Sequence, residues 1–243
     1  MAVVPTKARI GRRLALSLVG GIALAVAIGT LTSRALVGQD QATTWAVLIT
    51  GVYMALGIAL LVAFASNSSM RREILALQPA PAAGYRMGAA AWIGAYCLSG
   101  LIYLMAQVAG FDALEVVDVL LWVGADGGRL ETASAGVIAL ILLRVCLIVP
   151  VTEELLFRGA LYSWLRGRLS AWWTCAITGI AFGLVHQIPV FIPLAIVVGV
   201  AAGWVREKTG SVLPTIVMHA IQNVAVVVAS FVATGWDPTW SMG

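Results

Sequence analysis

The residues that can do chemistry in this chain fall into three short groups, each with the spacing of one helical turn. Side chains at positions i and i+4 lie on the same face of a helix, so each group presents its polar atoms together. All three groups lie in strongly apolar sequence, and they include both histidines of the chain. They are Glu153-Glu154 with Arg158, Phe182 with His186, and His219 with Asn223.

Ionisable residues in apolar sequence are costly if that sequence lies in a membrane. By insertion scales, a charged side chain at the bilayer centre costs about 2.5–3.5 kcal/mol. A chain that is 61% hydrophobic and only 11% charged has ample room to place its charges elsewhere. We therefore interpret the three groups as one functional site inside a membrane, with hydrolysis as its chemistry.

Two adjacent acids beside one arginine allow a division of roles. A carboxylate shielded from water takes up a proton more readily and can act as a general base, whereas a carboxylate beside arginine stays ionised. We expect Glu153 to be the reactive acid and Glu154 to form a structural pair with Arg158.

The two histidines and the asparagine would complete a hydrolytic site. A neutral imidazole at His186 would hold or polarise the same water, and His219 and Asn223 would donate hydrogen bonds to a developing oxyanion. An alternative is a zinc ion bound by Glu153, His186 and His219, which would activate the water as a Lewis acid. The residues alone leave both alternatives open.

The spacing along the chain also predicts how deep these groups lie. If the helix that carries Glu153 turns back near Leu169–Ser170, Glu153 and His186 are equally far from the turn. The Arg166-Gly167-Arg168 stretch is polar and suits such a turn. We therefore expect Glu153 and His186 to face each other across a helical hairpin.

A helical membrane bundle must position these groups. A mean hydropathy of +0.97 and repeated long apolar runs exclude an ordinary soluble domain. We predict an all-α, polytopic bundle of about seven or eight transmembrane helices, forming one membrane domain over residues 1–243 with a motif-bearing catalytic core at 133–233. The apolar runs predict helices at 14–32, 45–65, 89–109, 133–151, 170–187, 190–206 and 212–233.

Three features of this scheme need a structure to interpret them. The helical pattern that begins near Ala133 continues to about Arg166, and Pro150 is expected to kink it. Arg144 lies within this helix, where it would snorkel, line a cavity or pair with an acid. The short acidic segment 113–124 suggests an interfacial or re-entrant helix.

The charge distribution indicates membrane topology rather than nucleic-acid binding. The net charge is +4, and the basic residues cluster in predicted loops. Applying the positive-inside rule to these loops predicts an integral membrane protein with a cytoplasmic N-terminus, in contact with the lipid bilayer. We expect no nucleic-acid partner.

The motifs Glu-Glu-x-x-x-Arg, Phe-x-x-x-His and His-x-x-x-Asn, in this order on late apolar helices, resemble those of the type II CAAX prenyl endopeptidase family. This family is also known as the CPBP or Abi intramembrane proteases. The resemblance implies a bundle of about eight helices around a hydrophilic cavity that opens to the cytoplasm. It implies a peptide or membrane-associated protein as substrate, and zinc as a cofactor that the family is often, but not always, said to use.

The resemblance also assigns roles to residues. It implies that Glu153 activates water together with His186, and that His219 and Asn223 stabilise the oxyanion. The short chain is similar to the prokaryotic branch of the family, which implies a prokaryotic cell membrane. Prenylated substrates need not exist in that branch, so the resemblance assigns no CAAX substrate. The candidate site residues are Glu153, Glu154, His186, His219 and Asn223, with Arg158 and Phe182 in support.

Two other classes of function remain alternatives. A proton-coupled transporter would also use intramembrane Glu and His, but no paired broken helices recur in matching halves of the chain. A non-catalytic scaffold or immunity protein of the same fold would keep its activity in Glu153→Ala and His186→Ala variants. A protease would lose its activity in both.

Overall fold

In the computed structural model, residues 7–35, 41–65, 68–112, 115–118 and 134–234 are described, and every regular element within them is a helix. The predicted all-α fold is confirmed for these residues. Residues 113–114 and 119–124 of the predicted interfacial segment lie outside the described residues, whereas 115–118 are helical. The main helices are α1 (Lys7–Ala35), α2 (Gln41–Phe64), α3 (Ser68–Glu73), α4 (Ala82–Val108), α6 (Ala135–Leu143), α7 (Val149–Glu154), α8 (Tyr162–Arg166), α9 (Ala171–Leu184), α10 (Ile192–Thr209) and α11 (Leu213–Thr234).

The lengths and compositions of the helices identify an integral membrane protein. Five of the described helices are long and apolar enough to cross a membrane, and the predicted count of seven or eight spans stays a prediction. These five candidate spans are Ile10–Leu31, Thr43–Phe64, Ala82–Val108, Ala135–Arg166 and Leu213–Ala233.

The helix predicted over 170–187 is present but shorter, at Ala171–Leu184, and it is not among the five candidate spans. Helix α9 has 14 residues, which at 1.5 Å per residue is about 21 Å, shorter than a hydrocarbon core of about 30 Å. Gln187 has a left-handed backbone with φ of 57°, and Pro189 follows two residues later, so the helix cannot continue. His186 therefore lies in a turn just after the C-terminal end of the short helix α9.

The chain stays helical from Ala135 to Arg166, through Pro150. Two π-helical segments, η2 (Arg144–Ile148) and η3 (Leu155–Leu161), interrupt the α-helical hydrogen bonding on either side of α7. At the end of η2 the Val149 N–H donates to the Arg144 carbonyl, five residues back. The sequence predicted a kink at Pro150, and the structure shows this widened hydrogen-bond register immediately before it.

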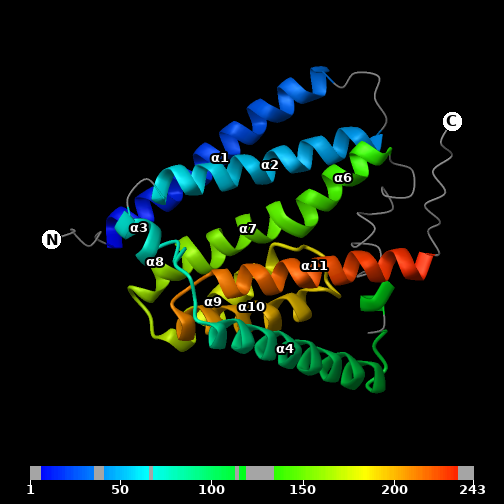
Figure 1. Ribbon diagram of the computed structural model, residues 1–243. Coiled ribbons are helices and arrows are strands. Elements are labelled where there is room, and N and C mark those ends of the chain that lie inside the picture. Colours follow the sequence, from blue (N-terminus) through cyan, green and yellow to red (C-terminus); the bar gives the residue numbers. More distant parts are fainter. Residues whose placement is uncertain (1–6, 36–40, 66–67, 113–114, 119–133, 235–243) are drawn as a thin grey trace.

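The helices form a row (Figure 1). The continuous helix from Ala135 to Arg166, which comprises α6, η2, α7, η3 and α8 and is called the long helix below, lies in the middle of this row. Helices α1 and α2 pack against each other at one edge, and α2 also contacts α6 and α7. On the other side α11 contacts η2 and α7, α9 packs against α10, and α10 packs against α4. The start of α1, helix α3, the end of α8 and the start of α11 lie at the same end of the bundle (Figure 1).

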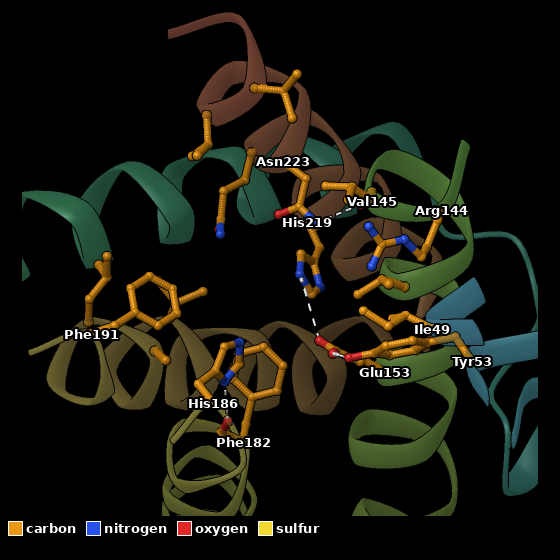
Figure 2. A pocket seen from close by; sticks show the side chains of 17 residues that line it. Ile49, Tyr53, Arg144, Val145, Glu153, Phe182, His186, Phe191, His219 and Asn223 are labelled. Carbon is orange, nitrogen blue, oxygen red and sulfur yellow. Dashed lines mark hydrogen bonds and ion pairs between the residues drawn. The ribbon is translucent and has the colours of Figure 1, made fainter. Parts of the chain in front are cut away.

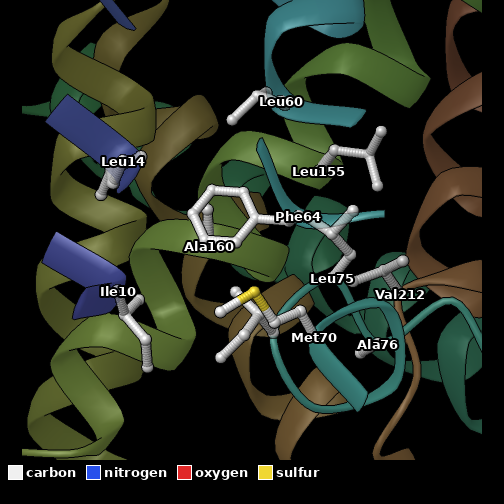
Figure 3. Packing of buried hydrophobic residues seen from close by; sticks show 11 residues of the cluster. Ile10, Leu14, Leu60, Phe64, Met70, Leu75, Ala76, Leu155, Ala160 and Val212 are labelled. Atoms are coloured by element: carbon white, nitrogen blue, oxygen red, sulfur yellow. The ribbon is translucent and has the colours of Figure 1, made fainter. Parts of the chain in front are cut away.

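A buried apolar cluster closes that end (Figure 3). It joins α1, α2, α3 and η3 to the segment before α11, where the Val212 N–H donates to the Ala76 carbonyl at 3.1 Å. The cluster packs the η3 end of the Ala135–Arg166 helix against the N-terminal helices. It contains Ile10, Leu14, Leu60, Phe64, Met70, Ile74, Leu75, Ala76, Leu155, Ala160 and Val212.

Glycines allow α9 and α10 to cross at unusually short range. A Cβ atom on Gly199 would lie 2.8 Å from the Gly179 Cα, and one on Gly183 would lie 2.3 Å from the Ile196 Cγ1. Small residues at i and i+4 permit such backbone contact in membrane helices. The crossing exposes the backbone of α10 to side chains of the long helix.

Candidate active site

A cavity of about 250 Å³ lies between α2, the long helix, α10, α11 and the inner end of α9. It contains residues from all three sequence motifs, so the fold brings together groups that are far apart in the chain (Figure 2). Its remaining wall is mostly apolar. The polar residues that line it are Tyr53, Arg144, Glu153, His186, His219, Gln222 and Asn223.

Glu154 and Arg158 form the ion pair that their spacing predicts, and they are fully buried. Arg158 Nη1 lies 3.0 Å from Glu154 Oε1, and neither side chain is more than 1% exposed. Arg158 Nη2 also donates to the Gly199 carbonyl at 3.1 Å. The guanidinium carbon lies 4.2 Å from the centre of the Phe182 ring, at cation–π distance. Arg158 thus joins the long helix to α9 and α10.

His219 lies between the two glutamates. Its Nδ1–H donates to Glu154 Oε1 at 3.1 Å, since a carboxylate can only accept. Its Nε2 lies 4.0 Å from Glu153 Oε2, beyond hydrogen-bond distance. Glu154 therefore orients the imidazole of His219 toward Glu153.

The two oxygens of Glu153 have different surroundings. Oε1 accepts a hydrogen bond from the Tyr53 hydroxyl at 3.0 Å. Oε2 is buried and has no hydrogen-bond partner within the described part of the chain. The side chain lines the cavity (Figure 2), so its unpartnered oxygen is the group best placed to bind a water there.

His186 is held in one orientation by the end of α9. Its Nδ1–H donates to the Phe182 carbonyl at 2.7 Å, which leaves Nε2 as the acceptor of a neutral ring. The rings of Phe182 and Phe191 lie 4.9 and 5.1 Å from its own. His186 and Glu153 line the same cavity, but no hydrogen bond or ion pair joins these two residues. Glu153 instead accepts a hydrogen bond from Tyr53 and has His219 Nε2 at 4.0 Å.

Asn223 stabilises the irregular backbone of η2. Its Nδ2 donates to the Val145 carbonyl at 2.8 Å. In a π-helical register this carbonyl would receive the N–H of residue 150, but that residue is a proline and has none. A similar arrangement occurs at η3, where Arg206 Nε donates to the Arg158 carbonyl at 3.1 Å.

The zinc ion that the sequence leaves as an alternative stays a prediction. Glu153, His186 and His219 all line the cavity. However, the described residues contain no cluster of three or more His, Cys, Asp or Glu side chains that could hold a metal ion. We therefore derive no step through a metal.

Three polar residues of the cavity, Tyr53, Arg144 and Gln222, were not assigned to the site from the sequence. Tyr53 lies on α2, where an isolated tyrosine in an apolar helix carries no motif. Arg144 is 4% exposed and lines the cavity, so the alternative in which it snorkels to the interface is wrong. The sequence signal for Arg144 was the free-energy cost of placing a charged side chain in the middle of a membrane helix.

Comparison with known proteins supports the interpretation of the motifs. The family model described as "Type II CAAX prenyl endopeptidase Rce1-like" matches residues 135–225, which contain all three motifs. No curated protein and no solved structure matches the chain. The family is a protease family. The resemblance predicted from the motifs is therefore confirmed: over residues 135–225 this chain is similar to the Rce1-like type II CAAX prenyl endopeptidases.

Proposed function

We propose that this protein is an intramembrane endopeptidase in which Glu153 activates water for attack on a peptide bond. One observation carries the proposal. Glu153 Oε2 is buried without a hydrogen-bond partner among the described residues, on a cavity that it shares with both histidines. Leaving a buried carboxylate oxygen unpartnered costs free energy, which a bound water would recover.

In this mechanism the water lies between Glu153 Oε2 and His186 Nε2, both of which can accept a hydrogen bond. Glu153 takes one proton as the water oxygen attacks the carbonyl carbon of the substrate. In this proposal His219 is the doubly protonated imidazolium, so that Nδ1–H donates to Glu154 and Nε2–H, together with an amide N–H of Asn223, donates to the oxyanion that forms. Glu153 then returns its proton to the leaving nitrogen, and the peptide bond breaks.

Glu154 and Arg158 hold this machinery in place. Their ion pair is buried, and Glu154 fixes the orientation of His219 through a hydrogen bond. Phe182 packs against Arg158, His186 and His219, so it keeps the three side chains at fixed distances. We assign these residues to positioning rather than to bond making.

The cleavage is proposed to occur near the cytoplasmic side of a prokaryotic cell membrane, with the N-terminus in the cytoplasm. The clustering of basic residues supports this orientation. Arg12 and Arg13 lie near the start of α1, Arg71 and Arg72 in α3, and Arg166 at the end of α8. These elements lie at one end of the bundle (Figure 1), as the positive-inside rule requires of a cytoplasmic face.

The test is cleavage of a library of quenched fluorescent peptides, including membrane-anchored ones, by the purified protein in detergent. We expect the wild type to cleave, and Glu153→Gln and His186→Ala to lose at least 100-fold in rate. The control is Glu73→Gln, which removes an exposed carboxylate on α3.

The outcomes separate the alternatives. Full activity in Glu153→Gln would refute the proposed mechanism. No cleavage by any folded variant would favour the non-catalytic scaffold, and pH-gradient-linked uptake that is lost in Glu153→Gln would favour transport. A parallel series with a chelator, followed by added zinc, decides whether the water is activated with a metal or without one.

A further inference from the structure

Helix α2 lies close to the Ala135–Arg166 helix at Gly57, next to the residue that precedes Glu153. A Cβ atom on Gly57 would lie 2.9 Å from the Thr152 Oγ1, so only glycine permits this distance without a shift. The neighbouring Ala55 is completely buried. Helix α2 lies outside residues 135–225, the segment that matches the protease family.

Tyr53 is bound to the long helix by two hydrogen bonds, one turn from this contact. The Thr152 hydroxyl donates to the Tyr53 carbonyl at 3.4 Å. The Tyr53 hydroxyl donates to Glu153 Oε1 at 3.0 Å. The first bond fixes the tyrosine backbone relative to α7, and the second fixes the carboxylate relative to the tyrosine.

The hydrogen bond from Tyr53 occupies Oε1 of Glu153 and leaves Oε2 as the oxygen that can bind a water. Because Oε1 is occupied by the hydroxyl, the carboxylate cannot rotate without losing this hydrogen bond. Oε2 is then the oxygen that lies 4.0 Å from His219 Nε2 and has no hydrogen-bond partner among the described residues. Figure 2 shows Glu153 between Tyr53 and His219, with its dashed contacts to both.

We propose that Tyr53 is a positioning residue for the general base, which it holds with Oε2 directed at the reacting water. This inference rests on the proposed function, since it requires Glu153 to act as the base. Tyr53 contacts neither water nor substrate in this role. Removing its hydroxyl should therefore lower the rate of the chemical step and leave substrate binding unchanged.

The kinetic test compares Tyr53→Phe with Tyr96→Phe on the best-cleaved peptide of the library. Tyr96 is a matched control, because its buried hydroxyl has no hydrogen-bond partner in the described structure and it does not line the cavity. We expect Tyr53→Phe to lower kcat about 10-fold, equivalent to about 1.4 kcal/mol, with KM within twofold of the wild type. Tyr96→Phe should keep the kcat and the KM of the wild type.

A second measurement needs no substrate. The melting temperatures of Tyr53→Phe, Glu153→Leu and the double variant form a cycle that reports whether the hydroxyl and the carboxylate interact, because a leucine side chain has no oxygen to accept the hydrogen bond. We expect the double variant to melt higher than the sum of the two single losses predicts. Additive losses would overturn the proposal even if no peptide is cleaved.

The kinetic outcomes distinguish this proposal from the function on which it rests. If Glu153→Gln is as active as the wild type, the proposed mechanism fails. If Glu153→Gln is inactive but Tyr53→Phe keeps its full kcat, only the positioning role fails. A rise in KM equal to the fall in kcat, together with a lower melting temperature, would show that Tyr53 acts only on the fold.

Discussion

Removing the Arg158 guanidinium should strongly destabilise the site. Arg158→Met keeps an unbranched side chain of similar length but loses the bond to Glu154 Oε1 and the bond to the Gly199 carbonyl. Glu154 would remain completely buried as a carboxylate without its cation. Breaking one partner of a buried ion pair costs about 3–5 kcal/mol. The hydrogen bond from His219 remains, so we expect a loss near 3 kcal/mol, the lower end of that range.

The assay is reversible unfolding in mixed micelles, with increasing SDS and circular dichroism as the signal. The double variant Glu154→Gln/Arg158→Met leaves neither charge, so it should regain at least about 2 kcal/mol relative to Arg158→Met alone. The control is Arg72→Met, which changes an exposed arginine on α3 and should stay within about 0.5 kcal/mol of the wild type.

Two results would refute this reasoning. If Arg158→Met unfolds within about 1 kcal/mol of the wild type, the pair does not stabilise the bundle. The single variant Glu154→Gln is measured as well. If the free-energy losses of Glu154→Gln and Arg158→Met simply add in the double variant, the two side chains do not stabilise each other. In either case the 3.0 Å ion pair would not contribute the stability that its burial predicts.

Three further predictions follow from packing and hydrogen bonding. Gly179→Ala places a Cβ atom 2.5 Å from the Val200 Cγ2 and 2.6 Å from the Val200 backbone nitrogen, so SDS unfolding should show a loss of about 1–3 kcal/mol. The control Gly94→Ala, where nothing lies within 4 Å of the new atom, should change stability by less than about 1 kcal/mol. Asn223→Ala leaves the Val145 carbonyl without its donor and should cost about 1–3 kcal/mol in the same assay; an unchanged stability would contradict the role given to this bond. Phe182→Ala empties a buried site between Phe157 and His186 and should cost about 3–5 kcal/mol, whereas Phe182→Leu, measured alongside, should keep more than half of that stability.

The local parts of the site could be predicted from the sequence because they depend only on helical spacing. Glu154 and Arg158 are four residues apart, and so are Phe182 and His186, so a helix brings each pair together whatever surrounds it. The apolar runs likewise predicted an all-α membrane protein, since only helices satisfy the backbone of such segments in lipid.

The long-range parts of the site could not be predicted in this way. Tyr53 and Glu153 are 100 residues apart, and His219 and Glu154 are 65 residues apart. Whether such residues meet depends on how far α2 and α11 are rotated about their own axes. The close contact at Gly57 sets that rotation for α2.

The sequence by itself predicted that Glu153, His186, His219 and Asn223 share one site, because charge in apolar segments is costly and the spacing places each group on one helical face. Only the tertiary structure decided which partners these side chains bind. In the structure Glu154 pairs with Arg158 and accepts a hydrogen bond from His219. One oxygen of Glu153 accepts a hydrogen bond from Tyr53, and Asn223 donates to the Val145 carbonyl. The physical reason is that a buried polar atom takes whichever partner the packing of the helices brings within about 3 Å, and that packing is a property of the whole bundle.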